Sequence, residues 1–295
     1  RHRGQGRVLT DSALTDQPVP GSPGDGLIRL RLDIAYDGSG FSGWAQQKHP
    51  EGLRTVQGEL QRVLGHLFGC VVEVQCAGRT DAGVHAHGQV AHVDVPASPA
   101  DIDARRINRA LPDDIRVLGI GAAPSGFDAR FAAIWRRYTY RVSDDGLGPD
   151  PLQRSHVLDW GRPLDLAAMN AAAEPLLGEH DFAPFCKQRE FTSTVRELLD
   201  LRWADRGDEV MELTVRADAF CHSMVRSLVG VLLPVGDHRQ SVDWPAQVLR
   251  AGVKNSAVTV MPAFPLVLEE VGYPEPGEYL ARQSRTRTFR SLPEA

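Results

Sequence analysis

The sequence predicts an α+β fold of two similar halves, in which mixed, mainly antiparallel sheets are flanked by helices. Two observations favour this class. Stretches that alternate apolar and polar residues interleave with stretches of helical periodicity, and the order strand, helix, strands, helix occurs twice. In the second half, residues 205–208 (DRGD) form a turn signal typical of a β-hairpin, which implies antiparallel pairing rather than a doubly wound parallel sheet.

The chain divides into four parts by composition and periodicity. Residues 1–26 mix Gly, Pro, Asp and Ser without periodicity, so we expect a flexible leader there. The first α+β half is expected over residues 27–125 and the second over residues 126–280. Residues 281–295 carry several arginines and are interpreted as a basic flexible tail, with an RNA contact as the alternative.

In the first half, residues 27–36 alternate Ile, Leu and Tyr with charged side chains, which predicts a half-buried strand ended by the turn sequence at 37–40. Thr55 is a suitable N-cap for a helix whose apolar positions recur every three or four residues, and Gly69 lies where that helix should end. The other expected elements are strands at 71–76, 89–95 and 115–120, a short helix near 101–110, and a loop at 77–88.

In the second half, residues 133–143 alternate as a strand and 165–177 carry a helical apolar stripe. The predicted hairpin strands are 195–203 and 210–217. Residues 220–235 are strongly apolar and predict a buried helix.

Composition excludes several classes of protein. No apolar run approaches the ~18 residues that a membrane span needs, and no hydrophobic stretch follows the basic first residues, so neither membrane association nor a secretory signal is expected. The cysteines, Cys70, Cys76, Cys186 and Cys221, are too few for a disulfide scaffold and lack C-x-x-C spacing. We therefore expect a reducing, cytoplasmic setting.

The charge pattern leaves two interpretations of the arginines open. The net charge of −5 argues against a protein that coats nucleic acid nonspecifically. However, only three of the 33 basic residues are lysines, at positions 48, 187 and 254. This bias reflects either the codon usage of a GC-rich genome or local arginine clusters that bind phosphate bidentately.

The segment 76–92 (CAGRTDAGVHAHGQVAH) is the densest in chemically active residues. Its glycines let the backbone turn tightly and approach a ligand, and they surround Arg79 and Asp81. A neighbouring cation favours the ionised form of such an aspartate. The alternative is an ordinary turn with a surface ion pair.

The histidines of this segment suggest a metal site as a competing interpretation. His85 and His87 are two residues apart on a strand and could chelate a metal together with Cys76 or His92. No carboxylate lies at the usual helper spacing, and hydrogen-bonded scaffolding is the commoner role of such histidines. We expect no metal.

Two other features point to an anionic ligand. Arg226 lies with His222 and Gly230 on one stripe of the apolar 220–235 segment, and a cation at a core boundary requires an anion. Tyr138 and Tyr140 alternate with arginines, a pattern found where bases stack beside phosphate contacts. The alternatives are a structural salt bridge and a core aromatic pair with solvated arginines.

Residues 78–86 (GRTDAGVHA) resemble the motif of the tRNA pseudouridine synthase A family. Seven further blocks also match the family and occur in its order, at 36–44, 55–57, 108 with 111–115, 127–131, 137–140, 178–182, and 220–226 with Gly230. The sequence departs from the family pattern at Ala45, where glutamine is usual, and at Pro265, where the family has glycine. The resemblance runs along nearly all of residues 27–270 and implies a pseudouridine synthase-like fold.

The resemblance also implies an activity and partners. Members of this family isomerise uridine to pseudouridine at positions 38, 39 and 40 in the tRNA anticodon stem-loop, with no metal or cofactor. They are homodimers whose tRNA spans both subunits, so a net negative charge is compatible with an RNA substrate. The uridine must leave its stack to be reached.

Matching the family motif residue by residue implies five roles. Asp81 matches the catalytic nucleophile. Arg79 matches the loop arginine that fills the vacated space and contacts phosphate. Tyr138 matches the tyrosine that stacks on the base and is a candidate acceptor of the C5 proton. Arg226 matches the basic partner of the aspartate, so we expect it beside Asp81, and Leu266 matches the leucine near the base pocket.

Affinity for RNA is expected to come from a cluster of cations, because phosphate contacts release counterions. The residues expected to converge in one positive cleft, completed across a dimer, are Arg79, Arg136, Arg137, Arg141, Arg105, Arg106 and Arg109. Strand alternation directs some of these side chains to the other face of the sheet. The competing functions are a metal-dependent hydrolase and a noncatalytic RNA-binding module.

Overall fold

The computed structural model describes residues 23–24, 26–46, 52–97, 103–144, 146–187, 193–207 and 209–287. Nearly all of the expected leader, residues 1–26, lies outside the described residues, and so does the end of the chain beyond residue 287. No helix in these ranges is long and apolar enough to cross a membrane.

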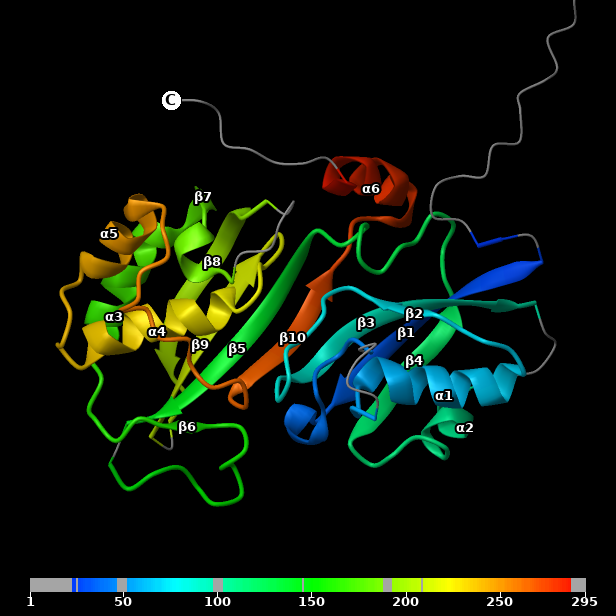
Figure 1. Ribbon diagram of the computed structural model, residues 1–295, viewed down its shortest axis with the longest axis horizontal. Coiled ribbons are helices and arrows are strands. Elements are labelled where there is room, and N and C mark those ends of the chain that lie inside the picture. Colours follow the sequence, from blue (N-terminus) through cyan, green and yellow to red (C-terminus); the bar gives the residue numbers. More distant parts are fainter. Residues whose placement is uncertain are drawn as a thin grey trace, which may run out of the picture.

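A single mixed sheet runs through the described part of the chain (Figure 1), in the order β4-β1-β3-β10-β5-β9-β8-β7. Two short strands extend it, since β2 pairs with β3 and β6 with β5. The strands are β1 Leu27–Tyr36, β2 Val74–Cys76, β3 His85–Pro96, β4 Ile115–Ala122, β5 Trp135–Ser143, β6 Leu158–Asp159, β7 Gly178–Asp181, β8 Val195–Asp205, β9 Val210–Ala217 and β10 Leu266–Gly272.

Strand β10 joins the strands of residues 27–125 to those of residues 126–280. It pairs in parallel with β3, where Val267 lies opposite His85, and antiparallel with β5, where Leu268 lies opposite Tyr138. All other pairs on the main path are antiparallel. The predicted α+β class and mainly antiparallel pairing are therefore confirmed. The strands of the two halves form one continuous sheet.

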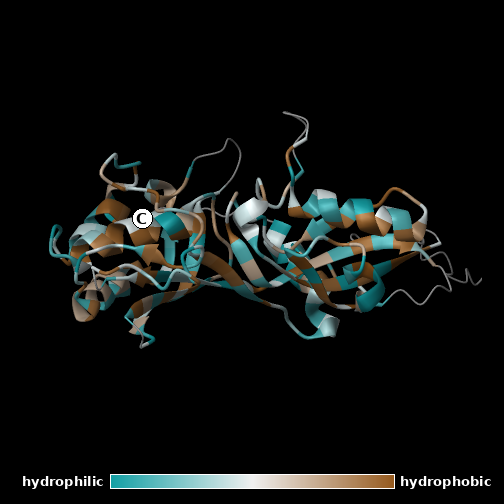
Figure 2. Cartoon of the chain, turned by 90° about the horizontal axis from the view of Figure 1, so that it is seen from below, coloured by the Kyte–Doolittle hydropathy of each residue, from teal (hydrophilic) through white to brown (hydrophobic). Residues whose placement is uncertain are grey.

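Most of the helices lie in front of the sheet in Figure 1, whereas the C-terminal helix lies at the upper edge of the molecule. Seen from below in Figure 2, the sheet is a curved layer whose strands carry long hydrophobic stretches. The helices are α1 Val56–Phe68, α2 Ala104–Asn108, α3 Leu166–Ala173, α4 Met224–Gly236, α5 Trp244–Ala251 and α6 Tyr279–Arg287, with 3-10 turns at Gly38–Gly40, Glu174–Leu176, Ala183–Phe185 and Pro276–Glu278.

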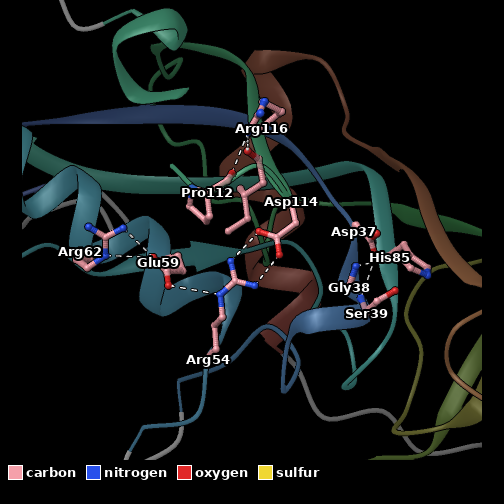
Figure 3. Close-up of polar contacts among 11 residues, drawn as sticks. Asp37, Gly38, Ser39, Arg54, Glu59, Arg62, His85, Pro112, Asp114 and Arg116 are labelled. Carbon is pink, nitrogen blue, oxygen red and sulfur yellow. Dashed lines mark hydrogen bonds and ion pairs between the residues drawn. The ribbon is translucent and has the colours of Figure 1, made fainter. Parts of the chain in front are cut away.

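Helix α1 has the ends that the sequence predicts. The Thr55 side chain accepts a hydrogen bond from the Gly58 amide, and Gly69 adopts the left-handed conformation at the C-cap. The buried positions Val56, Leu60, Val63 and Leu64 form one stripe against the sheet. Arg54, just before the helix, forms ion pairs with Asp114 at 2.6 Å and Glu59 at 3.7 Å, which ties the incoming loop to the start of β4 (Figure 3).

Three of the differences from the expectations affect the candidate functional residues. Helix α4 begins at Met224 rather than residue 220, because Ser223 has a φ of 67° and interrupts any helix before it. Strand β3 begins at His85, so the histidines belong to the strand and not to the loop. Helix α6 occupies the first part of the segment expected to be a flexible tail, because Tyr279 and Gln283 are buried against the fold.

Gly230 allows α4 to pack closely against the segment before β10. A Cβ added at this position would overlap the carbonyl oxygen of Thr259. We therefore expect Gly230→Ala to lower the free energy of unfolding by about 2–4 kcal/mol. Urea denaturation measures this, with Gly121→Ala as control because a Cβ there meets nothing within 4 Å. Equal stability of the two variants would contradict the close packing.

Candidate active site

A large cavity opens between the two halves of the sheet. Its volume is about 1410 Å³, which exceeds the roughly 300–1,000 Å³ of ordinary small-ligand pockets. Its walls come from the loops at 42–46, 77–84 and 218–226, together with residues of β5, β10 and α6. The size of the cavity indicates a substrate larger than a metabolite.

The loop between β2 and β3 is held in place by strands and by a neighbouring loop. The Tyr36 hydroxyl at the end of β1 lies 2.8 Å from Oγ1 of Thr80, and the Trp44 amide donates to the Thr80 carbonyl at 3.0 Å. The Gln89 side chain donates to the carbonyl of Gly78 at 2.7 Å. These contacts fix the backbone on both sides of Arg79 and Asp81.

Asp81 points from this loop toward the start of α4. Its Oδ2 lies 2.8 Å from an Nη atom of Arg226, and its Oδ1 lies 3.4 Å from Nε2 of His222. The Asp81 side chain is 32% exposed and that of Arg226 is 18% exposed, so the pair lies at the cavity wall and is partly screened from water. The predicted juxtaposition of Arg226 and Asp81 is confirmed.

Arg226 is itself positioned by several contacts. The same guanidinium donates to the Ser223 hydroxyl at 3.1 Å and to the Met261 carbonyl at 3.3 Å. The Met261 amide in turn donates to the Arg226 carbonyl at 3.2 Å. Helix α4 and the segment that precedes β10 thus hold the cation in a defined place, so that the carboxylate faces a rigid partner.

Tyr138 lines the same cavity from β5. Its ring lies edge-to-face on Phe220, with ring centroids 5.1 Å apart and planes at 87°. Burial raises the pKa of the Tyr138 phenol above its ordinary value, while Arg136 opposes this effect, so the hydroxyl is protonated at neutral pH. Leu266 also lines the cavity, and Pro265 lies in the turn before it, so the departure from the family glycine leaves the leucine in place.

The other carboxylates that line the cavity have different environments. Asp218 is buried, and its Oδ1 accepts hydrogen bonds from the amides of Glu197 and Ala219. Glu73 is exposed before β2. Of the lining carboxylates, Asp81 is the one that faces the cavity with an arginine and a histidine beside it.

Arg79 and Arg136 both line the cavity but have different roles. Arg79 is exposed, and within the described ranges no carboxylate lies within ion-pair distance of it. Arg136 is buried, and its guanidinium donates to the carbonyls of Ala77, Asp218 and Arg130 at 2.7–2.9 Å. Burial lowers its pKa. Arg136 therefore supports the cavity wall, which corrects its expected role as a phosphate contact.

The other arginines expected in the positive cleft do not reach this cavity. Arg137 and Arg141 lie on the opposite face of β5, where they pair with Glu270 and Glu212. They alternate with Tyr138 along the strand, so the pleat directs them away. Helix α2 contacts the edge strand β4. Its arginines, Arg105 and Arg106, do not line the cavity, and neither does Arg109, which follows the helix. The structure therefore does not bring these five arginines to the cavity that contains Asp81.

The ring nitrogens of the histidines considered as metal ligands contact other groups of the protein. His85 Nδ1 lies 2.9 Å from the Gly38 amide and 3.1 Å from Asp37 (Figure 3), and Nε2 lies 2.8 Å from the Phe264 carbonyl. His85 thus joins the ends of β1 and β3 to the segment before β10. His92 is buried, which lowers its pKa to about 4, and its Nδ1 accepts from the Ala129 amide.

One grouping of possible metal ligands differs from the expected one. The donor atoms of Asp37, His85 and His156 lie within 4.8 Å of one another. The His85 contacts already occupy both of its ring nitrogens, so this arrangement favours a structural role. His87 is exposed on β3 and pairs with Glu269, apart from this group.

Sequence reasoning missed several residues at the site. His222 was recognised only as part of a helical stripe, although it lies before α4 and contacts Asp81. Arg130 and Phe131 belong to a motif block, but no local signal placed them on the cavity wall. Cys186 and Cys221 form a disulfide, with their Cα atoms 5.7 Å apart, which two cysteines 35 residues apart did not indicate.

Comparisons with known proteins agree with this geometry. A family profile described as tRNA pseudouridine synthase matches residues 34–132 and 172–274. The tRNA pseudouridine synthase A of Streptomyces avermitilis is 53% identical over 279 residues, covering 92% of this chain and 96% of the relative. That of Frankia casuarinae is 52% identical over 91% of this chain and 98% of its own length, and that of Mycobacterium leprae is 47% identical over 90% and 96%.

Among solved structures, a chain from a Cbf5-Nop10-Gar1 complex aligns with 70% of this chain and 54% of its own length. The identity is 11% and the TM-score 0.29, which is too low to inform the fold. The family profile and the relatives match most of the chain, including the loop with Asp81 and the start of α4 with Arg226. The chain therefore belongs to the tRNA pseudouridine synthase family.

Proposed function

We propose that this chain isomerises uridine to pseudouridine at positions 38, 39 and 40 of the tRNA anticodon stem-loop. The observation that carries the proposal is the Asp81 carboxylate, held 2.8 Å from Arg226 at the wall of a cavity that Tyr138 and Leu266 also line. Identity of 44–53% to relatives named tRNA pseudouridine synthase A supports the same activity.

The reaction exchanges one bond to C1′ for another, and its atoms balance without a cofactor. The bond between N1 and C1′ breaks, the uracil turns, and a bond forms between C5 and C1′. The C5 proton leaves and N1 gains a proton. Asp81 is the proposed nucleophile that assists the departure of the uracil and then leaves again, and Arg226 keeps its carboxylate oriented toward the ribose.

Reaching C1′ requires the uridine to leave the helical stack. Arg79, exposed at the mouth of the cavity, is the proposed occupant of the space that the base vacates. Tyr138 is the proposed stacking surface for the extruded uracil, and its protonated phenol is the proposed relay for the C5 proton. The phenol oxygen takes this proton as it releases its own hydroxyl proton, which balances the proton gained at N1. Leu266 closes the pocket on its apolar side.

Tyr138→Phe separates stacking from proton transfer. The phenyl ring keeps the stacking surface but cannot accept a proton, so we expect the single-turnover rate to fall by about 100-fold while tRNA affinity stays within about twofold. Tyr138→Ala should in addition weaken binding, because the stacking surface is lost. Rapid-quench kinetics and filter binding measure the two quantities. A Tyr138→Phe variant with the parent rate would exclude proton transfer by Tyr138.

We further propose a cytoplasmic homodimer that uses neither a metal nor an organic cofactor. Light scattering coupled to gel filtration should give twice the chain mass of 32.3 kDa. Elemental analysis of the purified protein distinguishes this proposal from a metal-dependent hydrolase, since stoichiometric zinc or iron would favour the hydrolase. The noncatalytic RNA-binding module predicts tRNA binding without pseudouridine.

Mapping pseudouridine in tRNA from cells with and without this protein tests the proposed function. We expect pseudouridine at positions 38–40 to disappear when the protein is absent and to return when the intact chain is supplied. Return with an Asp81→Ala chain would show that the modification does not depend on this site. Unchanged pseudouridine in the absence of the protein would contradict the proposal.

A further inference from the structure

The cavity that contains Asp81 extends to a wall that the family profile does not cover. The profile match ends at residue 274, whereas Arg282, Thr286 and Arg287 of helix α6 line the cavity. Beside them, Arg130 and Phe131 line it from the segment before β5. Helix α6 is seen at the upper edge of the molecule in Figure 1, beyond the end of β10.

Two arginines of this wall flank one aromatic ring. The Arg287 guanidinium carbon lies 4.7 Å from the centroid of Phe131, and that of Arg130 lies 5.2 Å from the same centroid. Both arginines are exposed, and Phe131 is partly buried. Contact with a ring restrains an arginine while leaving the N–H groups at the edge of the guanidinium able to bind an anion.

No acidic side chain neutralises this pair within the described part of the chain. Ion pairs there account for many other arginines, among them Arg137 and Arg141 on the far face of the sheet, but not for Arg130 or Arg287. Helix α6 contains three arginines and no acidic residue. On a chain with a net charge of −5, two adjacent uncompensated cations indicate a site for an anion.

The position of α6 is determined by specific contacts with the body of the protein. The buried Tyr279 ring lies edge-to-face on Phe127 at 5.5 Å, and the Gln283 amide donates to the Gly126 carbonyl at 2.6 Å. Arg282 donates to the Ala133 carbonyl at 3.2 Å. These anchors lie on both sides of Arg130 and Phe131 in sequence, so α6 and that segment form one preorganised unit.

We propose that Arg130, Phe131 and Arg287 form a phosphate site that binds the tRNA backbone beside the reacting uridine. Arginine edges match phosphate oxygens bidentately, and the side-chain oxygen of Gln283, 3.4 Å from an Nη atom of Arg287, helps to orient that guanidinium. Two cations without a carboxylate partner favour the phosphate backbone over base edges. Because this wall belongs to the same cavity as Asp81, the bound phosphate flanks the extruded nucleotide. This inference rests on the proposed function and adds α6 to the substrate-binding surface.

The test compares Arg287→Ala and the double variant Arg130→Ala, Arg287→Ala with Arg285→Ala. Arg285 lies on the same helix, is exposed and does not line the cavity, which makes it the matched control. We expect Arg287→Ala to weaken binding of an unmodified tRNA transcript about fivefold and to flatten the slope of log affinity against log salt by about 1. The double variant should lose more on both measures, and Arg287→Lys should recover the slope.

Binding is measured with all of these variants in an Asp81→Asn background, which prevents turnover, so its outcome does not depend on the proposed reaction. An affinity and a salt slope of Arg287→Ala equal to those of Arg285→Ala would overturn the phosphate site, provided that thermal melting shows both variants folded. In turnover assays of the otherwise unchanged protein, Arg287→Ala should raise KM much more than it lowers kcat. Failure of the proposed function would look different, since the parent protein would bind tRNA and form no pseudouridine.

Discussion

Asp81→Asn is expected to lower the single-turnover rate of pseudouridine formation by at least about a thousandfold. The amide keeps the size of the side chain but has no charged oxygen with which to assist bond breaking at C1′. Affinity for tRNA should stay within about twofold, because the cationic surface that binds phosphate is unchanged. Release of tritium from tRNA labelled at C5 of uridine measures the rate, since the C5 proton leaves in each turnover.

Asp113→Asn is the matched control for this experiment. Its carboxylate is fully exposed and pairs with Arg116 at 2.9 Å, and neither residue lines the cavity. Removing that charge should leave both rate and affinity within about twofold of the parent, because exposed ion pairs contribute little. An Asp81→Asn rate within tenfold of the parent would contradict the assignment of Asp81 as the nucleophile.

Arg226→Met is expected to have the second largest effect, on both rate and stability. The methionine fills much of the same volume, but it leaves Asp81 without the arginine partner and with the His222 ring nitrogen 3.4 Å away. We expect the rate to fall by about 100-fold, because the carboxylate loses its fixed orientation. Unfolding should require about 1–2 kcal/mol less free energy, a modest value because Asp81 is 32% exposed.

A double-mutant cycle separates the ion pair from other effects of the substitution. If the unpaired carboxylate causes the loss of stability, the variant with both Asp81→Asn and Arg226→Met should be more stable than Arg226→Met alone. Urea denaturation of the four proteins gives the coupling free energy. Strict additivity of the two single effects would show that Arg226 stabilises α4 independently of Asp81.

Much of the fold could be predicted because local periodicity and turn chemistry agree with the tertiary structure. The alternation in residues 27–36 and the caps of α1 at Thr55 and Gly69 are local signals, and the structure bears them out. The parallel pairing of β10 with β3 is different, because its partners lie about 180 residues apart and nothing local encodes their register. A single sheet could therefore be suspected but not distinguished from two.

Part of the candidate site could be predicted because a charged residue in an apolar segment requires a partner of opposite charge. A cation on the apolar α4 segment requires an anion, and the structure places Arg226 against Asp81. The positions of the expected RNA-contact arginines could not be predicted for the opposite reason, because an exposed arginine finds acceptors in many places. Arg136 donates hydrogen bonds to three backbone carbonyls, and Arg137 forms an ion pair with Glu270 on the neighbouring strand β10. The contribution of α6 was missed because its anchors, Tyr279 and Gln283, are too sparse to give a helical pattern.

The most direct test of the central claim is nucleotide-resolution mapping of one unmodified tRNA transcript after incubation with the purified protein. The transcript carries uridines at positions 38, 39 and 40 and elsewhere, and the parallel reaction contains Asp81→Asn. We predict pseudouridine at the three anticodon-arm positions with the parent protein, none at the other uridines, and none with Asp81→Asn. Absence of pseudouridine with the parent, its appearance only outside the anticodon arm, or equal formation by Asp81→Asn would contradict the account.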